Sequence, residues 1–235
     1  MTIKSVAMDL EGTLVDVERA HHEAFLRVAA DYGFVLSFEE AIERIPGFIG
    51  GGDPAVLRGI LRLLGSDEGQ VEALRLQKMK YYNEILKEME IRPRPGSVRV
   101  IRWFQRNGFK VMLGSLTPKV QAAVLFNKTG LDKIIGRENI ILGEDVRNPK
   151  PAPDIFLKTA ERAGVAPQEQ LVFEDSAVGI QAAKAAGSIP IAMPVYNMPA
   201  VIKALAEAGA VRIFMDWRKI NIRSLLSDIN KTLAG

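Results

Sequence analysis

Acidic residues at two places in the chain have the types and spacing of a catalytic metal site. Asp9 and Glu11 flank one leucine in the stretch "MDLEGTLVD", and Glu174 and Asp175 are adjacent in "LVFEDS". Each pair follows a short apolar run, which predicts a buried strand that ends at a polar turn. Clustered carboxylates repel one another unless a cation lies between them, and oxygen ligands of this type suit Mg²⁺. The pattern therefore indicates a magnesium site.

A serine and a lysine complete a candidate site for a phosphate group. Ser115 ends the apolar run "FKVMLGS", and Lys150 lies in the proline-rich segment "NPKPAPD". A hydroxyl and an ammonium group can both hold phosphate oxygens. With a cation between the acids, one carboxylate remains to attack phosphorus in line, and a second can handle the proton of the leaving oxygen. These residue types together are typical of phosphoryl transfer.

The elements that must position these residues alternate between strands and helices after residue 90. Strands are predicted at residues 3–10, 109–115, 133–136, 139–142, 171–176, 189–193 and 211–216. Helices are predicted between them, one of which starts at Thr117 as its N-cap, followed by Pro118. This alternation favours an α/β fold with a doubly wound parallel sheet and helices on both faces. Ligands of such sheets bind outside the carboxyl ends of the strands, where the polar residues lie.

Residues 17–90 have a different pattern, with helical periodicity, glycine-rich loops and no convincing strand. Within this segment "SFEE" predicts a capping box formed by Ser37 and Glu40. The connector "RPRPG" that follows is stiff, because its prolines restrict the backbone. We therefore predict a core domain of residues 1–16 and 91–235, with an all-helical domain inserted at 17–90.

Composition excludes several kinds of site. The chain has no cysteine, which excludes disulfides, thiolate metal sites and cysteine nucleophiles. Its only histidines are His21 and His22, so a histidine zinc site or a Ser-His-Asp triad is not expected. The net charge of +3 favours small anionic substrates.

Neither a nucleic acid nor a membrane is expected as a partner. The basic stretch from Arg92 to Lys110 has the spacing of the solvated face of an amphipathic helix. The longest uncharged stretch, residues 185–202, contains three prolines that would break a spanning helix. No secretory signal is visible near the first residues. We expect a cytoplasmic protein that is a monomer or a weak dimer.

Four motifs together resemble those of the haloacid dehalogenase (HAD) superfamily, in the branch with a helical cap inserted after the first strand. They are "DLEGTLVD", "LGSLTP", "NPKPAPDIF" and "VFEDSAVGIQAAKAAG", in the order found in that family. The chain is similar to β-phosphoglucomutase-like and phosphoglycolate phosphatase-like hydrolases from Ile3 to about Met193. The resemblance implies a Rossmann-like core, and a cap at 17–90 that closes over the site and excludes water.

The resemblance also implies roles for individual residues. Asp9 would be the nucleophile that forms a phospho-aspartate, and Glu11 the general acid and base. The implied ligands of Mg²⁺ are Asp9, the backbone carbonyl of Glu11, Asp175, and Glu174 directly or through water. The implied phosphate-binding residues are Ser115, Lys150 and Thr13. Possible substrate contacts in the cap are His21, Gly51 and Gly52.

Glu11 departs from the aspartate that the family usually has at this place. The longer side chain displaces the carboxyl group by about 1 Å, and a 1 Å misplacement can cost about 100-fold in rate. Relatives such as the enolase-phosphatases also carry D-x-E-G-T, so an active enzyme is still expected. An acid at this position favours an oxygen leaving group over a halide, which needs no proton.

The sequence therefore predicts a Mg²⁺-dependent phosphatase that hydrolyses a small phosphorylated metabolite through a phospho-aspartate. One alternative is a sugar phosphomutase of the β-phosphoglucomutase type. That reaction needs a cation for the distal phosphate, whereas the glycine-rich cap loop offers Asp53. The other alternative is a catalytically weak binding protein that has kept the fold.

Overall fold

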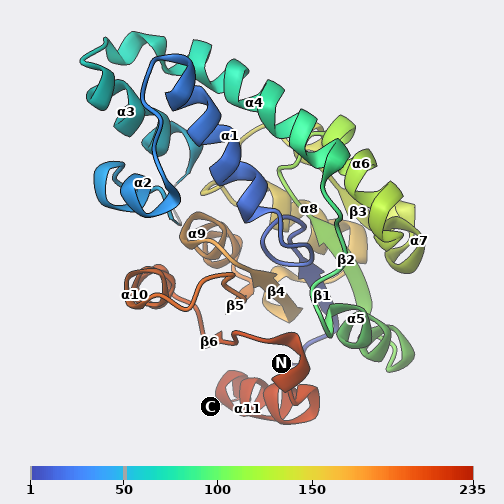
Figure 1. Ribbon diagram of the computed structural model, residues 1–235. Helices are drawn as coiled ribbons and strands as arrows, with labels where there is room; N and C mark the ends of the chain where they lie inside the picture. The colour runs from blue at the N-terminus through green and yellow to red at the C-terminus, as the bar shows by residue number, and fades with distance from the viewer. Residues whose placement is uncertain (1, 50–51, 235) are drawn as a thin grey trace. The chain divides into compact units, whose positions relative to one another are not determined.

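The computed structural model describes residues 2–49 and 52–234 (Figure 1). Contacts within the chain divide it into two compact units. The first consists of Met1–Asp16 and Ile91–Gly235, and the second of Val17–Glu90. None of the described helices combines the length and hydropathy that a membrane span requires.

A six-stranded parallel sheet forms the centre of the first unit, with the strand order β3-β2-β1-β4-β5-β6. The strands are β1 (Ser5–Met8), β2 (Lys110–Gly114), β3 (Ile140–Ile141), β4 (Gln170–Glu174), β5 (Ile189–Ala192) and β6 (Arg212–Ile213). The chain order reverses at β1, which lies between β2 and β4. Such a switch point opens a crevice at the carboxyl ends of the strands. The predicted doubly wound α/β fold is confirmed.

Helices cover both faces of this sheet (Figure 1). They are α5 (Ser97–Arg106), α6 (Lys119–Thr129), α7 (Leu131–Ile135), α8 (Asp154–Ala163), α9 (Ala177–Ala185), α10 (Pro199–Ala208) and α11 (Ile222–Ala234). On one face Val172 of β4 packs with Phe156 of α8 and Ala183 of α9. Its neighbour Phe173 points to the opposite face, where its ring centroid lies 4.9 Å from that of Trp217. Both faces of β4 are therefore buried, which explains its continuous apolar sequence.

One predicted strand is wrong. Residues 133–136 were expected to be extended, but Leu131–Ile135 forms the short helix α7. Leu131 and Ile135 are both buried, at 0% and 3% exposure, and their spacing places them on one helical face. The β-branched pair at 134 and 135 favoured a strand locally, and tertiary packing overrode that preference.

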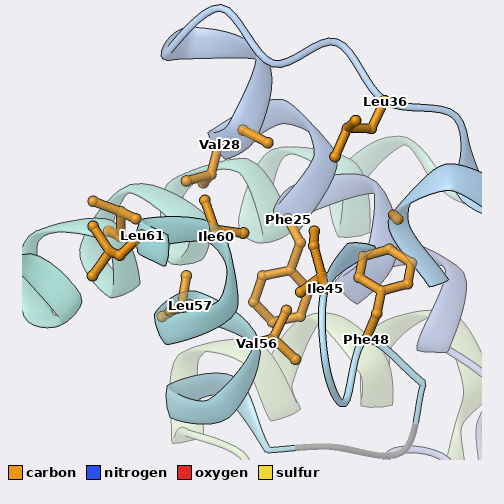
Figure 2. Close-up of a cluster of buried hydrophobic side chains, with 12 residues drawn as sticks. Phe25, Val28, Leu36, Ile45, Phe48, Val56, Leu57, Ile60 and Leu61 are labelled. Carbon is orange, nitrogen blue, oxygen red and sulfur yellow. The ribbon is translucent and has the colours of Figure 1, made fainter. Parts of the chain in front are cut away.

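The described residues of the second unit form four α-helices and no strand. They are α1 (Glu18–Asp31), α2 (Phe38–Arg44), α3 (Asp53–Leu64) and α4 (Val71–Glu88). Figure 2 shows the apolar core of this unit, where Phe25 and Val28 of α1 meet Leu57 and Ile60 of α3. The predicted capping box of α2 is confirmed, because the side chains of Ser37 and Glu40 each accept the other residue's backbone N–H.

Candidate active site

The turn that follows β1, here called the Asp9 turn (residues 9–16), contains one backbone position, Gly12, that favours glycine. Asp9 continues the strand, because its N–H donates to the carbonyl of Phe173 at 3.0 Å. Gly12 then adopts a φ of +73°, and a Cβ at this position would lie 2.1 Å from Oδ2 of Asp175. The glycine of "DLEGT" therefore permits both the left-handed backbone and the close approach of Asp175.

Lys150 pairs with two carboxylates, one directly after β1 and one on the last residue of β4. Its Nζ lies 2.6 Å from Oδ1 of Asp9 and 2.7 Å from Oε2 of Glu174, and all three side chains are buried. The ammonium group also lies 5.1 Å from the ring centroid of Phe156. Because the ion pairs are short and shielded from water, the lysine neutralises part of the acidic charge at the strand ends.

Glu174 is held in place by the start of α9. Its Oε1 accepts a hydrogen bond from the Ser176 hydroxyl at 2.7 Å and another from the Ser176 N–H at 3.1 Å. The same hydroxyl caps the helix by accepting from the N–H of Gly179 at 3.1 Å. Since the other carboxylate oxygen binds Lys150, both oxygens of Glu174 have defined partners.

Three carboxylates in this site are placed to hold a metal ion. Each of Asp9, Glu174 and Asp175 offers one oxygen, and these oxygens lie within 4.8 Å of one another. The Thr13 hydroxyl donates to Oδ1 of Asp175 at 3.0 Å and so orients that carboxylate. An all-oxygen donor set with excess negative charge fits a hard divalent cation such as Mg²⁺. The carboxylate of Glu11 is not part of this cluster.

Burial sets the protonation behaviour of the site. It raises the pKa of Asp9 to about 7, an effect that Lys150 opposes and that Glu174 reinforces. Burial alone would lower the pKa of Lys150, but the two carboxylates beside it raise that pKa above its ordinary value. The lysine is therefore charged at neutral pH.

Ser115 lies at the carboxyl end of β2, buried and 2% exposed. Its Oγ is 3.0 Å from Oγ1 of Thr117. Thr117 was predicted to cap α6, but that helix begins at Lys119 with Pro118 in the cap position and no side-chain cap. The Thr117 hydroxyl instead pairs with Ser115 and fixes the direction of the serine.

The structure describes two of the three sequence-predicted residues of the second unit. Gly51 lies outside the described residues, and Gly52 occupies the N-cap of α3. Nδ1 of His21 is 2.7 Å from Nζ of Lys78, which also pairs with Oδ2 of Asp53 at 2.8 Å.

Lys78 is fully buried and was not identified from the sequence. Its Nζ lies 5.0 Å from the ring centroid of Tyr82, which stacks on His21. The sequence around Lys78 does not indicate that this lysine is buried. Its partners, His21 and Asp53, come from α1 and α3, which are distant in sequence.

Arg94 was also missed. The sequence placed it in a basic stretch interpreted as a solvated helix face, and that interpretation holds for the exposed Arg102 and Arg106 of α5. Arg94 precedes the helix, is half-buried, and donates three hydrogen bonds to backbone carbonyls. The repeated prolines of "RPRPG" could have indicated that its neighbours are not helical.

Comparisons with known proteins agree with this geometry. A family model described as haloacid dehalogenase-like hydrolase matches residues 3–187. The chain belongs to this family. It is therefore a hydrolase of the HAD superfamily, and the predicted family is confirmed.

Individual relatives cover nearly the whole chain. The phosphorylated carbohydrates phosphatase of Thermotoga maritima is 31% identical over 94% of this chain and 98% of its own. The fructose-1-phosphate phosphatase YqaB of Escherichia coli K12 is 32% identical over 76% of this chain and 90% of its own. The crystal structure of a HAD hydrolase of family IA, variant 3, from Entamoeba histolytica has a TM-score of 0.80. It is 22% identical and covers 97% of this chain and 100% of its own, so it supports the fold.

Proposed function

We propose that this HAD hydrolase is a Mg²⁺-dependent phosphatase that acts on a small phosphorylated carbohydrate or a similar phosphomonoester. The observation that carries the proposal is the cluster of Asp9, Glu174 and Asp175 at the switch point of the sheet, with Lys150 paired to Asp9 and Glu174. Two relatives that match most of this chain are phosphatases of phosphorylated carbohydrates by name, which supports the substrate class.

In this proposal Asp9 attacks phosphorus and becomes a phospho-aspartate. Glu11 protonates the leaving alcohol and later removes a proton from the attacking water. Lys150 and Ser115 stabilise the charge that develops on the phosphoryl oxygens. Thr13 stays a candidate phosphate-binding residue, and its hydroxyl also supports the site by donating to Asp175.

The proposed metal would be held by Asp9, Asp175 and the backbone carbonyl of Glu11, with Glu174 binding directly or through water. When bound, it would supply a positive charge that offsets repulsion between the carboxylates and the phosphate. It would also keep Asp9 ionised, because a cation beside a carboxylate lowers its pKa. The burial that raises the pKa of Asp9 is consistent with this role.

The second unit, Val17–Glu90, serves in this proposal as the cap that selects the substrate and excludes water. Its candidate substrate contacts are His21, Gly51 and Gly52. Nδ1 of His21 lies 2.7 Å from Nζ of Lys78, an ammonium group that can only donate, so this contact holds the imidazole ring in place.

The proposal is tested by phosphate release from a panel of sugar phosphates and from p-nitrophenyl phosphate. We expect Mg²⁺-dependent turnover in the wild type, loss of activity with EDTA, and no turnover in Asp9→Asn. Failure to release phosphate from any substrate would contradict the proposal and favour a binding protein. Isomerisation of glucose 1-phosphate with a bisphosphate primer, without phosphate release, would instead indicate a mutase.

A further inference from the structure

Arg94 connects the Asp9 turn to the loop that follows β5. Its Nη1 donates to the carbonyl of Gly12 at 2.6 Å and to that of Met193 at 2.6 Å. Its Nη2 donates to the carbonyl of Pro194 at 2.9 Å. The backbone N–H of Arg94 adds a bond to the carbonyl of Leu14 at 2.7 Å. One residue thus holds the Asp9 turn at two points and ties it to the neighbouring loop.

The bond to Gly12 controls the direction of the turn at its most constrained residue. A peptide group is planar, so fixing the carbonyl of Gly12 also fixes the orientation of the bond that leads into Thr13. Thr13 in turn directs its hydroxyl to Asp175. Asp9 and Glu11 precede the same peptide by a few bonds. The Arg94 guanidinium therefore stabilises the backbone that presents these candidate site residues.

Arg94 keeps its charge although it is half-buried. Burial lowers the pKa of Arg94 below its ordinary value, and the nearby Asp175, Asp16 and Asp216 offset only part of that effect. A guanidinium stays protonated in proteins, and it offers a planar fork of donors. A lysine ammonium carries its N–H donors on one nitrogen. It therefore cannot reproduce the contacts that the two terminal nitrogens of Arg94 make with Gly12, Met193 and Pro194.

We propose that Arg94 is a positioning residue, which holds the Asp9 turn in the geometry that phosphoryl transfer requires. This inference rests on the proposed phosphatase function. Arg94 contacts carbonyl oxygens and not the reacting carboxylates, so its loss should slow the chemical step more than it weakens substrate binding.

The test compares kcat, KM and melting temperature for Arg94→Met, Arg94→Lys and a matched control. The control is Arg162→Met, because Nη1 of Arg162 also donates to a backbone carbonyl, that of Glu138 at 2.8 Å, away from the acidic site. With p-nitrophenyl phosphate and Mg²⁺ we expect kcat to fall about 10- to 100-fold in Arg94→Met, as for a misplaced catalytic group. We expect KM to change less than about threefold, an intermediate kcat in Arg94→Lys, and wild-type kcat in Arg162→Met.

Chemical rescue adds a readout that a merely structural role would not move. In Arg94→Ala, millimolar guanidinium chloride should restore part of the lost kcat, whereas equal concentrations of sodium chloride should not. Folded Arg94→Met with wild-type kcat, or a kcat loss that Arg162→Met reproduces, would overturn the inference. If Arg94→Met does not fold, Arg94→Lys decides: reduced kcat at unchanged KM supports the inference, and wild-type kcat overturns it.

Asp9→Asn separates this result from the proposed function. An active wild type and an inactive Asp9→Asn, together with fully active Arg94 variants, would overturn only the role of Arg94. A wild type without phosphatase activity would overturn both.

Discussion

The side chain of Glu11 lies outside the three-carboxylate cluster, and in the proposed mechanism it transfers protons rather than holding the metal. The contribution of the Glu11 carboxyl group to the rate should depend on the leaving group. An alkyl alkoxide needs a proton as it departs, whereas p-nitrophenolate leaves readily without one. The longer acid at this position therefore matters most for natural alcohol leaving groups.

We predict that Glu11→Gln lowers kcat/KM for a sugar phosphate by about 100-fold or more, the typical contribution of general acid catalysis. For p-nitrophenyl phosphate the loss in kcat/KM should be at most a few-fold. Parallel steady-state assays of both substrates provide the measurement. Glu161→Gln is the control, because Glu161 is an exposed acid of α8. Equal losses with both substrates would contradict the assignment of Glu11 as the acid.

His22 gives a prediction for stability in the second unit. It is 3% exposed, its ring centroid lies 4.9 Å from that of Phe48, and burial lowers its pKa to about 4. Between pH 6.5 and 4 the unfolded chain therefore binds a proton that the folded chain does not. The free energy of unfolding should fall as pH drops through this window, by on the order of 3 kcal/mol.

Denaturant unfolding of wild type and His22→Gln at several pH values from 7 to 4.5 measures this effect. The variant is expected to be less stable at pH 7, because it changes a packed side chain. Its stability should decline less steeply with falling pH. Parallel pH profiles for the two proteins would show that His22 does not contribute.

At the scale of elements, the start of α9 shapes the metal cluster. A Cβ on Gly179 would lie 2.0 Å from the carboxyl carbon of Glu174. The Glu174 carboxyl group can therefore lie against the start of α9 only because Gly179 lacks a side chain. This close approach lets the N-terminal turn of α9 hold Glu174 beside Lys150.

We predict that Gly179→Ala displaces Glu174 and lowers kcat by about 10-fold or more, since small misplacements are costly in catalysis. Gly33→Ala is the control: Gly33 has a φ of +87° and open surroundings, so its substitution strains the backbone without changing the site. Melting temperature and kcat should be measured for both. Wild-type kcat in a folded Gly179→Ala would contradict the proposed importance of Glu174.

The elements differ in how well their sequences predicted them. β1, β2, β4 and β5 were identified because buried parallel strands leave continuous apolar runs. The helix α7 was missed because its β-branched residues resemble a strand over so short a segment. The partners of the Arg94 side chain lie 82 to 100 residues away in sequence, so no local pattern could reveal them.

At the scale of the whole molecule, the parallel topology assembles the candidate site from distant segments. Asp9 and Lys150 are separated by 141 positions, yet they form an ion pair at the carboxyl ends of the strands. The order of the motifs, and the tendency of ligands to bind at the carboxyl ends of parallel strands, predicted that these two residues lie close together. The distances that distinguish the carboxylates from one another depend on packing, as with Glu174 against Gly179, and they required the structure.

The central claim is that Asp9 carries the phosphoryl group. The most direct measurement is to quench the enzyme during turnover of a phosphomonoester with Mg²⁺, reduce any acyl phosphate with borohydride, and identify the modified residue by peptide mass spectrometry. The proposed mechanism predicts conversion of Asp9 to homoserine, dependent on substrate and absent in Asp9→Asn. Rapid turnover by Asp9→Asn, or modification at another residue in an enzyme whose Asp9 stays unmodified, would contradict it.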